Sequence, residues 1–413
     1  MDEQEYIVLE VRPTGPVRRG GPRDQRAGPT AATVSVESLS SPQAAAARRD
    51  PGVAVAPLLP LKLVEPVSKR DTGTPTGPGS AWGVDAVGAL ESPFTGAGVT
   101  VAVLDTGIDA AHEAFRGVQI TQRDFTGEGD GDHDGHGTHC AGTIAGRDIN
   151  GYRYAVAPGV EELLVAKVLG TEGGSTAALM RGILWALEAG ADVMSMSLGL
   201  DFPGLVTRWT EDGMPLEPAT SRALEGYRDT LRLFGTLAGV LRAAGPYGGS
   251  ALVLAATGNE SRRRAPTPYT LGVSPPAGSE GFVAVGALER TSDGALDIAD
   301  FSNSGATVAA PGVDIRSARA GGGFTELSGT SMAAPHAAGV AALWAESMLS
   351  SAGRIDADIL LARLTGNSEE LPGVAAADAG TGLVRAPRGQ GGRPDGLELR
   401  ARHRAGASDW QRR

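Results

Sequence analysis

Four near-continuous apolar runs lie in the first two thirds of the chain, at 99–105, 162–169, 192–198 and 251–257. Runs without polar alternation are typical of parallel strands that are buried on both faces. Between them, apolar residues recur at three- and four-residue steps, and we expect helices at 175–190 and 218–245. Strands that alternate with helices predict a three-layer, doubly wound α/β domain with a mostly parallel sheet. The apolar face of the second helix is expected to contain Leu224, Tyr227, Leu231, Phe234, Leu237 and Leu241.

The chain before this domain has shorter elements that are interrupted by prolines. Its patterns predict strands at 6–11 and 33–39, a short helix at 41–49, and one or two strands within 52–64. Composition then divides the chain into four parts. We expect a small N-terminal α/β region at 1–67, a Gly/Pro/Thr-rich linker at 68–81, the large domain at 82–387 and a disordered tail at 388–413.

Charge and hydropathy narrow the classes of partner. The 413 residues carry a formal net charge of −11, which argues against nucleic acid and anionic membranes as partners. No stretch approaches the roughly 20 apolar residues that are needed to cross a bilayer. We therefore expect no nucleic-acid or membrane partner. We also expect the chain to be a monomer.

The single cysteine and the first residues bear on the compartment. Cys140 stands alone, so no intramolecular disulfide can form, and we expect it to be a packed small hydrophobic residue. The N-terminal residues are acidic and lack the apolar core of a signal peptide. These features predict a cytoplasmic protein, although export by another route stays open.

Three short motifs place a carboxylate, an imidazole and a hydroxyl at the ends of predicted elements. Asp105 ends an apolar strand in VLDTGID, His136 lies between glycines in DGHGTHC, and Ser331 opens an apolar helix in GTSMAAPH. A carboxylate can orient an imidazole, which can take the proton of a serine hydroxyl. Each residue alone is more often a helix cap or a turn residue. Together they predict a catalytic triad.

A fourth polar residue follows another buried strand. Asn259, in ATGNES, could donate its side-chain amide to an oxyanion beside Ser331, together with the Ser331 backbone N–H. On its own, an asparagine at this place would be a turn residue.

A metal site is the competing interpretation of the histidine-rich segment. His133, His136 and His139 recur at three-residue steps beside several aspartates. On a helix such steps spread the side chains around the axis. The segment 130–135 also imitates the start of a calcium loop, but Ala141 stands where the closing glutamate belongs. We expect no dedicated metal site here.

The motifs DTGID, HGTHCAG, SLG, GN and GTSMAAPH, in this order, resemble those of the subtilisin-like serine peptidase family. The resemblance covers about 82–387. It implies a serine endopeptidase that hydrolyses protein or peptide substrates through an acyl-enzyme, with Asp105, His136 and Ser331 as the triad and Asn259 in the oxyanion hole. It also implies two walls of the primary specificity pocket, which are formed by Ser197, Leu198 and Gly199 and by Ala256, Thr257 and Gly258.

The resemblance has three further implications. Cys140 matches a free cysteine beneath the catalytic histidine in the proteinase-K-like branch. The N-terminal region resembles an inhibitory propeptide that is cleaved within 67–80. The family's calcium loop would fall at 147–158, with Asp148 and Asn150 as oxygen ligands. That loop departs from the usual pattern, so no required cofactor is expected and a structural calcium ion stays open.

Two alternatives use the same residues. The chain could be a catalytically silent peptide-binding protein or a permanently latent zymogen on the same fold, or its activity could be that of an esterase or a ligase. A surplus of residues at 201–220 predicts a surface insertion near the pocket rim that narrows substrate choice.

Overall fold

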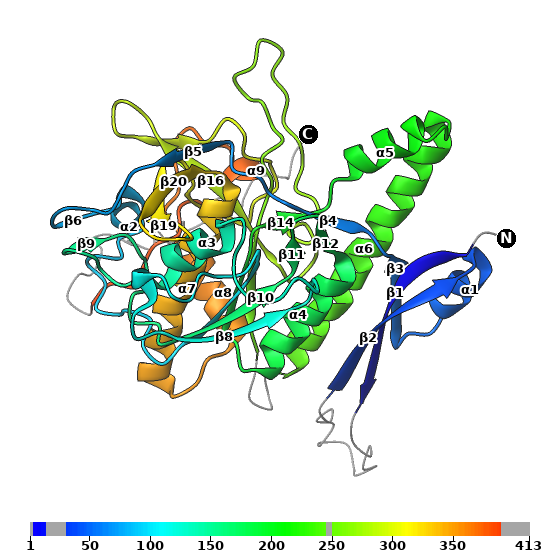
Figure 1. The fold of residues 1–413 in the computed structure, drawn as a ribbon, viewed down its shortest axis with the longest axis horizontal. Helices are drawn as coiled ribbons and strands as arrows, with labels where there is room; N and C mark the ends of the chain where they lie inside the picture. Colours follow the sequence, from blue (N-terminus) through cyan, green and yellow to red (C-terminus); the bar gives the residue numbers. More distant parts are fainter. Residues whose placement is uncertain (1–2, 14–29, 245–249, 390–413) are drawn as a thin grey trace, which may run out of the picture.

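A twisted, mostly parallel sheet forms the centre of the molecule in the computed structural model, which describes residues 3–13, 30–244 and 250–389 (Figure 1). Its strand order is β17-β16-β15-β13-β7-β10-β8, with β18 also beside β16, and the β16–β17 pair is antiparallel. The four predicted apolar runs form strands of this sheet, which confirms the predicted fold class. The strands are β7 (Thr100–Asp105), β8 (Gln119–Asp124), β10 (Glu162–Lys167), β13 (Val193–Met196), β15 (Leu252–Ala256), β16 (Val283–Arg290), β17 (Leu296–Ile298) and β18 (Val308–Pro311).

Helices cover both faces of the sheet and complete three layers. Successive residues of β7 point to opposite sides, so Val101 and Val103 join one apolar core while Ala102 and Leu104 join the other. The first core includes α3 (His136–Ala145) and α7 (Thr330–Ala352); the second includes α4 (Thr176–Glu188) and α6 (Leu216–Ala244). Burial on both faces explains why these strands lack polar alternation.

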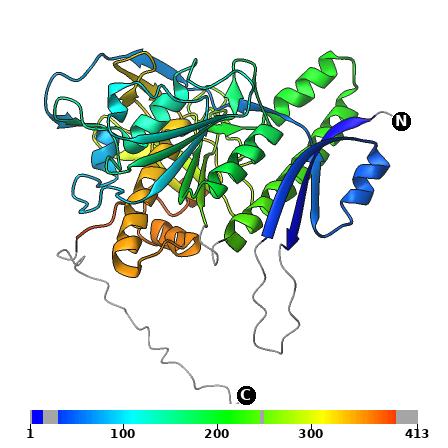
Figure 2. The same ribbon diagram turned by 60° about the horizontal axis from the view of Figure 1, so that its bottom comes forward.

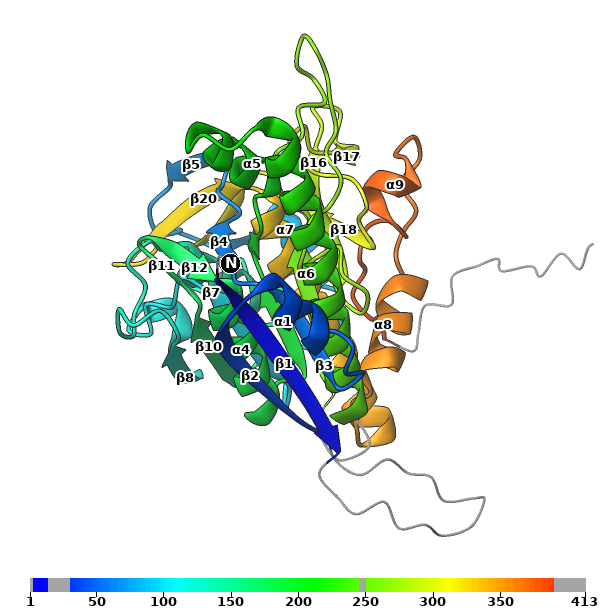
Figure 3. The ribbon, with the colours of Figure 1, turned by 90° about the vertical axis from the view of Figure 1, so that its right-hand side faces the viewer.

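The predicted insertion forms a helical arm. It consists of α5 (Phe202–Glu211) and the first turns of α6, which stand clear of the sheet in Figure 1 and lie towards the viewer in Figure 3. Phe234, Leu237 and Leu241 are buried as expected. The expectation for Leu224 was wrong, because this side chain is 64% exposed. In this part of α6, the small Ala223 is buried instead.

The N-terminal region folds as an antiparallel sheet with one short helix. The strand order is β2-β1-β3, and Tyr6 and Val8 of β1 form a small core with Ala44 of the helix. Ile7 and Leu9, on the opposite face, join the core of the large domain. Figure 2 shows this region lying beside α6. The elements are β1 (Gln4–Pro13), β2 (Thr30–Leu39), α1 (Ser41–Ala47) and β3 (Val53–Pro57).

The expected linker at 68–81 contains two short strands. β5 (Ser68–Asp71) pairs with β20 (Phe324–Ser328), and β6 (Gly79–Ser80) pairs with β9 (Tyr152–Arg153).

The tail expected at 388–413 lies outside the described residues from 390 onward. Within the described part of the chain, no helix has both the length and the apolar character needed to cross a membrane. The other elements are β4 (Pro60–Leu63), α2 (Trp82–Ala86), η1 (Glu113–Phe115), β11 (Leu169–Gly170), β12 (Gly173–Ser175), β14 (Leu198–Gly199), β19 (Ile315–Ala318), α8 (Ala357–Gly366) and α9 (Ala376–Ala379).

Candidate active site

Asp105, His136 and Ser331 come together at the carboxyl edge of the sheet, where open α/β folds place their ligands. Asp105 is the last residue of β7, His136 the first of α3 and Ser331 the second of α7. The His136 Nδ1 atom lies 2.8 Å from the Asp105 Oδ1 atom, and both side chains are 1% exposed. The carboxylate therefore fixes the orientation of the imidazole.

Cys140 shows how close His136 and Ser331 lie. Its sulfur is 3.7 Å from the His136 Nδ1 atom and 3.4 Å from the Ser331 carbonyl oxygen. Burial raises the pKa of the Cys140 thiol, so the neutral group packs between the segments that carry His136 and Ser331 as a small hydrophobic residue.

The environment of His136 favours a charged imidazole. Burial acts to lower its pKa, but the neighbouring Asp105 carboxylate outweighs that effect, and the pKa lies well above the ordinary value. The His136 Nε2 atom is buried and has no hydrogen-bond partner among the described residues. This is the atom that would exchange a proton with Ser331.

Hydrogen bonds to the half-buried Asp132 join the segments that carry Asp105 and His136. Asp132 accepts hydrogen bonds from the Thr106 hydroxyl at 2.8 Å and from the Thr138 hydroxyl at 2.6 Å, and the Thr106 oxygen accepts one from the Gly137 N–H. A Cβ atom on Gly137 would collide with the backbone of Gly107. Sequence reasoning treated Asp132 only as a metal candidate. Thr106, directly after Asp105, and Thr138, two residues after His136, were the signal for its positioning role.

Asn259 is held so that its amide nitrogen faces the groove. Its Oδ1 atom accepts hydrogen bonds from the N–H and the hydroxyl of Thr330, both at 2.9 Å. The Nδ2 atom therefore points away from Thr330 and donates to the Glu65 carbonyl at 2.8 Å. The Ser331 N–H belongs to the first turn of α7, whose amides have no acceptor within the helix. The two predicted oxyanion donors, the Asn259 amide and the Ser331 N–H, thus both lie at the N-terminal end of α7.

The predicted pocket walls flank the same point. Ser197 leads into β14, and its hydroxyl donates to the Ser331 carbonyl at 3.1 Å, while Leu198 and Gly199 form β14 itself. On the other wall, Ala256 ends β15, and Thr257 and Gly258 lead to Asn259; both walls contribute residues to one continuous groove.

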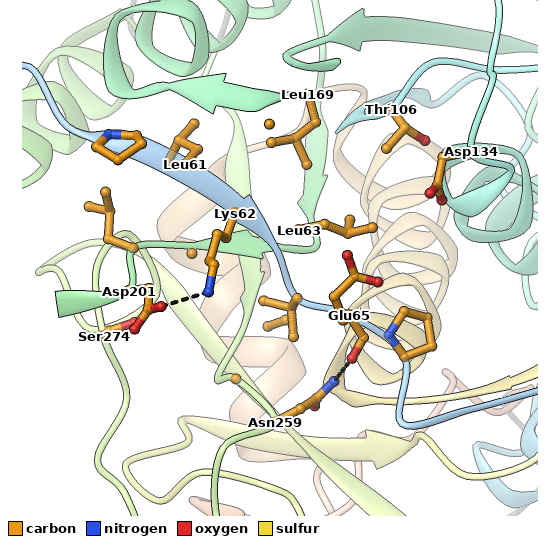
Figure 4. A pocket seen from close by; sticks show the side chains of 18 of the residues that line it. Leu61, Lys62, Leu63, Glu65, Thr106, Asp134, Leu169, Asp201, Asn259 and Ser274 are labelled. Carbon is orange, nitrogen blue, oxygen red and sulfur yellow. Dashed lines mark hydrogen bonds and ion pairs between the residues drawn. The ribbon is translucent and has the colours of Figure 1, made fainter. Parts of the chain in front are cut away.

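The chain's own N-terminal region occupies this groove (Figure 4). Strand β4 runs antiparallel to β14, with Lys62 opposite Gly199 and Leu63 opposite Leu198. The Val64 N–H donates to the Ser197 carbonyl at 3.2 Å. Leu61 is 1% exposed and belongs to the core beneath the groove. The occupant therefore binds by strand addition.

Two successive carbonyls of the occupant share the catalytic contacts. The Ser331 hydroxyl donates to the Val64 carbonyl at 2.7 Å, whereas the Asn259 amide donates to the next carbonyl, that of Glu65. Hydrolysis requires the nucleophile and the oxyanion donors to act on one carbonyl group. The bond nearest to Ser331, between Val64 and Glu65, also lies upstream of the 67–80 segment where cleavage was expected.

The histidines of the competing metal interpretation do not converge. His139 is buried and contacts the Ile315 carbonyl at 2.9 Å, and burial lowers its pKa to about 3. His133 is exposed. Among the described residues, the one group with metal-ligand spacing is Asp105, His136 and Cys140. It consists of two residues of the candidate triad and the cysteine that packs against them.

Arginines occupy the loop that the resemblance assigned to calcium. Arg153 donates to the carbonyls of Ala155 and Val156 at 3.2 and 2.9 Å, and Arg147 donates to the Pro158 carbonyl. The Asn150 amide nitrogen donates to the Pro75 carbonyl, and Asp148 is exposed. The carbonyl oxygens of this loop thus accept hydrogen bonds from positively charged guanidinium groups. The residues of the loop therefore do not fit a calcium ion, which needs oxygen ligands.

Several proteins that are named as proteases are similar to this chain in sequence. The chain is 34% identical over 285 residues to Subtilisin-like protease 6 of Trichophyton soudanense, which covers 63% of this chain and 57% of the relative. It is 36% identical over 265 residues to the protein of the same name from Trichophyton verrucosum, covering 60% and 52%. It is also 34% identical over 258 residues to the Major intracellular serine protease of Bacillus subtilis, covering 60% and 68%. The chain thus spans just over half the length of these fungal relatives.

The family model of the subtilases matches residues 96–354. This range contains the buried Asp105–His136 pair, Asn259 and Ser331 together with the parallel sheet that positions them. The chain therefore belongs to the subtilase family.

Proposed function

We propose that this chain is a serine endopeptidase that cleaves extended segments of proteins or peptides, and that the form described here is its latent state. The observation that carries the proposal is the occupied groove. An extended strand pairs with β14 and presents the Val64 carbonyl to the Ser331 hydroxyl. A groove that binds a strand in this way is suited to a peptide substrate.

In the proposed reaction, the Ser331 oxygen attacks a peptide carbonyl carbon while His136 Nε2 takes the hydroxyl proton. The negative charge that develops on the carbonyl oxygen is stabilised by the Asn259 amide and the Ser331 N–H. The C–N bond then breaks, and His136 returns the proton to the leaving amine. The acyl group stays on Ser331 until water, deprotonated by His136, releases the acid.

The N-terminal region is proposed to act as the inhibitor of this site. Its sheet is anchored through Ile7 and Leu9, and Arg48 forms an ion pair of 2.7 Å with the buried Asp229 of α6. These contacts hold β4 in the groove at high effective concentration. Self-cleavage at the N-terminal region would be the first step towards an open groove.

Labelling by a fluorophosphonate probe tests both parts of the proposal. We expect the intact chain to react slowly and Leu61→Asp to react at least about tenfold faster, because a carboxylate replaces a buried leucine that anchors the strand. Leu61→Ala should give a smaller increase. Lys69→Ala, at an exposed position beyond Ser331, should leave the rate unchanged.

Other outcomes would separate the alternatives. Absence of labelling in all variants, with the fold intact by circular dichroism, would support a silent peptide-binding protein. Labelling of the intact wild-type chain at the rate of Leu61→Asp would show that the strand does not inhibit.

Calcium is proposed to be unnecessary for this protein, because Arg147 and Arg153 already satisfy the loop carbonyls. We expect the melting temperature to be the same in a chelator and in millimolar calcium. Arg153→Ala should lower it by several degrees, since hydrogen bonds from a charged group contribute about 1.5–3 kcal/mol. Arg181→Ala, at an exposed site of α4, is the matched control. A large stabilisation by calcium would contradict the proposal.

A monomeric state and a cytoplasmic location remain predictions from the sequence. Sedimentation of the purified chain would test the first and fractionation of the source cells the second.

A further inference from the structure

The occupant strand also shows what the groove recognises. Lys62 lies opposite Gly199 in the β4–β14 pair, and its Nζ atom is 2.6 Å from the Asp201 Oδ2 atom (Figure 4). We propose that Asp201 selects substrates with a basic side chain at the third residue before the cleaved bond. This inference rests on the proposed endopeptidase function and names a substrate preference of that same site.

Asp201 is held in place by the helical arm. It is the N-cap of α5, and its Oδ1 atom accepts a hydrogen bond from the Gly204 N–H at 2.9 Å. This bond leaves the Oδ2 atom free to face the groove. The carboxylate therefore meets an incoming side chain without first having to be ordered, which reduces the entropic cost of the contact.

The local charges keep Asp201 ionised. Burial alone would raise its pKa, but hydrogen bonds from Lys62 and Gly204 and the charge of Arg208 outweigh that effect, and the pKa is lowered. Arg208 is the residue of α5 that could compete for the carboxylate. Among the described residues, Arg208 and Asp201 form no ion pair, whereas Lys62 and Asp201 do form one.

The alternation of the strand explains why a rim charge acts at this position. Leu61 is buried in the groove, whereas the Lys62 side chain is 68% exposed and that of Asp201 is 31% exposed. A partly exposed pair contributes about 0.2–1 kcal/mol. Asp201 is therefore expected to change the preference among substrates by a few fold and not to decide whether they bind.

The preference can be measured as a ratio. The full-length chain is incubated until its turnover is steady, and three peptides that differ only in having Lys, Gln or Glu at the third position compete for it. Because the peptides share one preparation, the fraction of active molecules cancels in the ratio of kcat/KM. We expect the wild-type chain to prefer Lys over Gln by about threefold and Gln over Glu by a similar factor.

Three variants identify the residue responsible. Asp201→Asn keeps a side chain that caps a helix equally well, and it should bring the three peptides within about 1.5-fold of one another. Asp201→Lys should invert the order. Asp212→Asn removes the same charge at the other end of α5 and should leave the order unchanged.

The outcomes distinguish this inference from the proposed function. Hydrolysis that depends on Ser331 but shows the same Lys preference in wild type and Asp201→Asn would overturn the role of Asp201 and leave the endopeptidase standing. Equal hydrolysis of all three peptides by the wild-type chain would do the same. No hydrolysis of any peptide, even by Leu61→Asp, would overturn the proposed function itself.

Discussion

Ser331→Ala is expected to lower kcat for casein or a peptide by on the order of 10⁶-fold, the loss known from subtilisin itself when its nucleophile is removed. Within the described parts of the chain, the hydroxyl makes one hydrogen bond, to the Val64 carbonyl of the occupant strand. The variant should therefore fold normally while the nucleophile is missing. Rates are measured with the groove opened by Leu61→Asp in both proteins, so that latency does not hide the effect.

The matched control is Ser351→Ala in the last part of the same helix, where the hydroxyl bonds only to its own helix. It should hydrolyse at the parent rate. Unchanged hydrolysis by Ser331→Ala would remove Ser331 from the mechanism, and fluorophosphonate labelling of that variant at another residue would point to a different nucleophile.

Asp105→Asn is expected to lower kcat by on the order of 10⁴-fold, as the corresponding change does in trypsin, because the amide no longer holds the imidazole in the correct tautomer. The pH profile should change as well. The Asp105 carboxylate raises the pKa of His136, and a protonated His136 cannot act as a base. Wild-type activity is therefore lost as the pH falls through the raised pKa, and the residual activity of Asp105→Asn should persist to lower pH.

The measurement is kcat/KM against pH, which reports ionisations of the free enzyme. Asp109→Asn is a suitable control, because Asp109 lies in the loop after β7 and its carboxylate accepts hydrogen bonds from the N–H groups of Ala111 and Gly321. Its acidic limb should match that of the wild type. An acidic limb that stayed in place in Asp105→Asn would show that another group controls the proton transfer.

Much of this site could be predicted because its residues lie where local patterns end. Asp105 follows an apolar strand, His136 stands between glycines that permit close backbone approach, and Ser331 starts an apolar helix. The burial of a strand on two faces leaves a clear trace in its own sequence. The sheet, and the grouping of Asp105, His136 and Ser331 at its edge, could therefore be predicted from the sequence.

The strand that occupies the groove was harder to predict from the sequence. The segment 52–64 was expected to form strands, and it does, but its pattern carries no information on which strand it pairs with. β4 pairs with β12 and β14, which lie more than a hundred residues further along the chain. Partner choice in sheets depends on side-chain packing across the pair and not on the strand alone. The Lys62–Asp201 contact could not be predicted either, because it depends on the pairing of β4 with β14.

The split between the Val64 and Glu65 carbonyls has a consequence for how the chain could begin to process itself. Sliding β4 along β14 by one residue would not bring a single carbonyl to both groups, because it replaces the carbonyls of Val64 and Glu65 with another pair of successive carbonyls, and it would also turn every side chain to the opposite face. Leu61 would then point to solvent and Lys62 into the apolar groove, at a cost of several kcal/mol. The alternation of β4 thus locks its register, and the adjustment that brings one carbonyl to both groups must come from a local change of backbone between Val64 and Pro66.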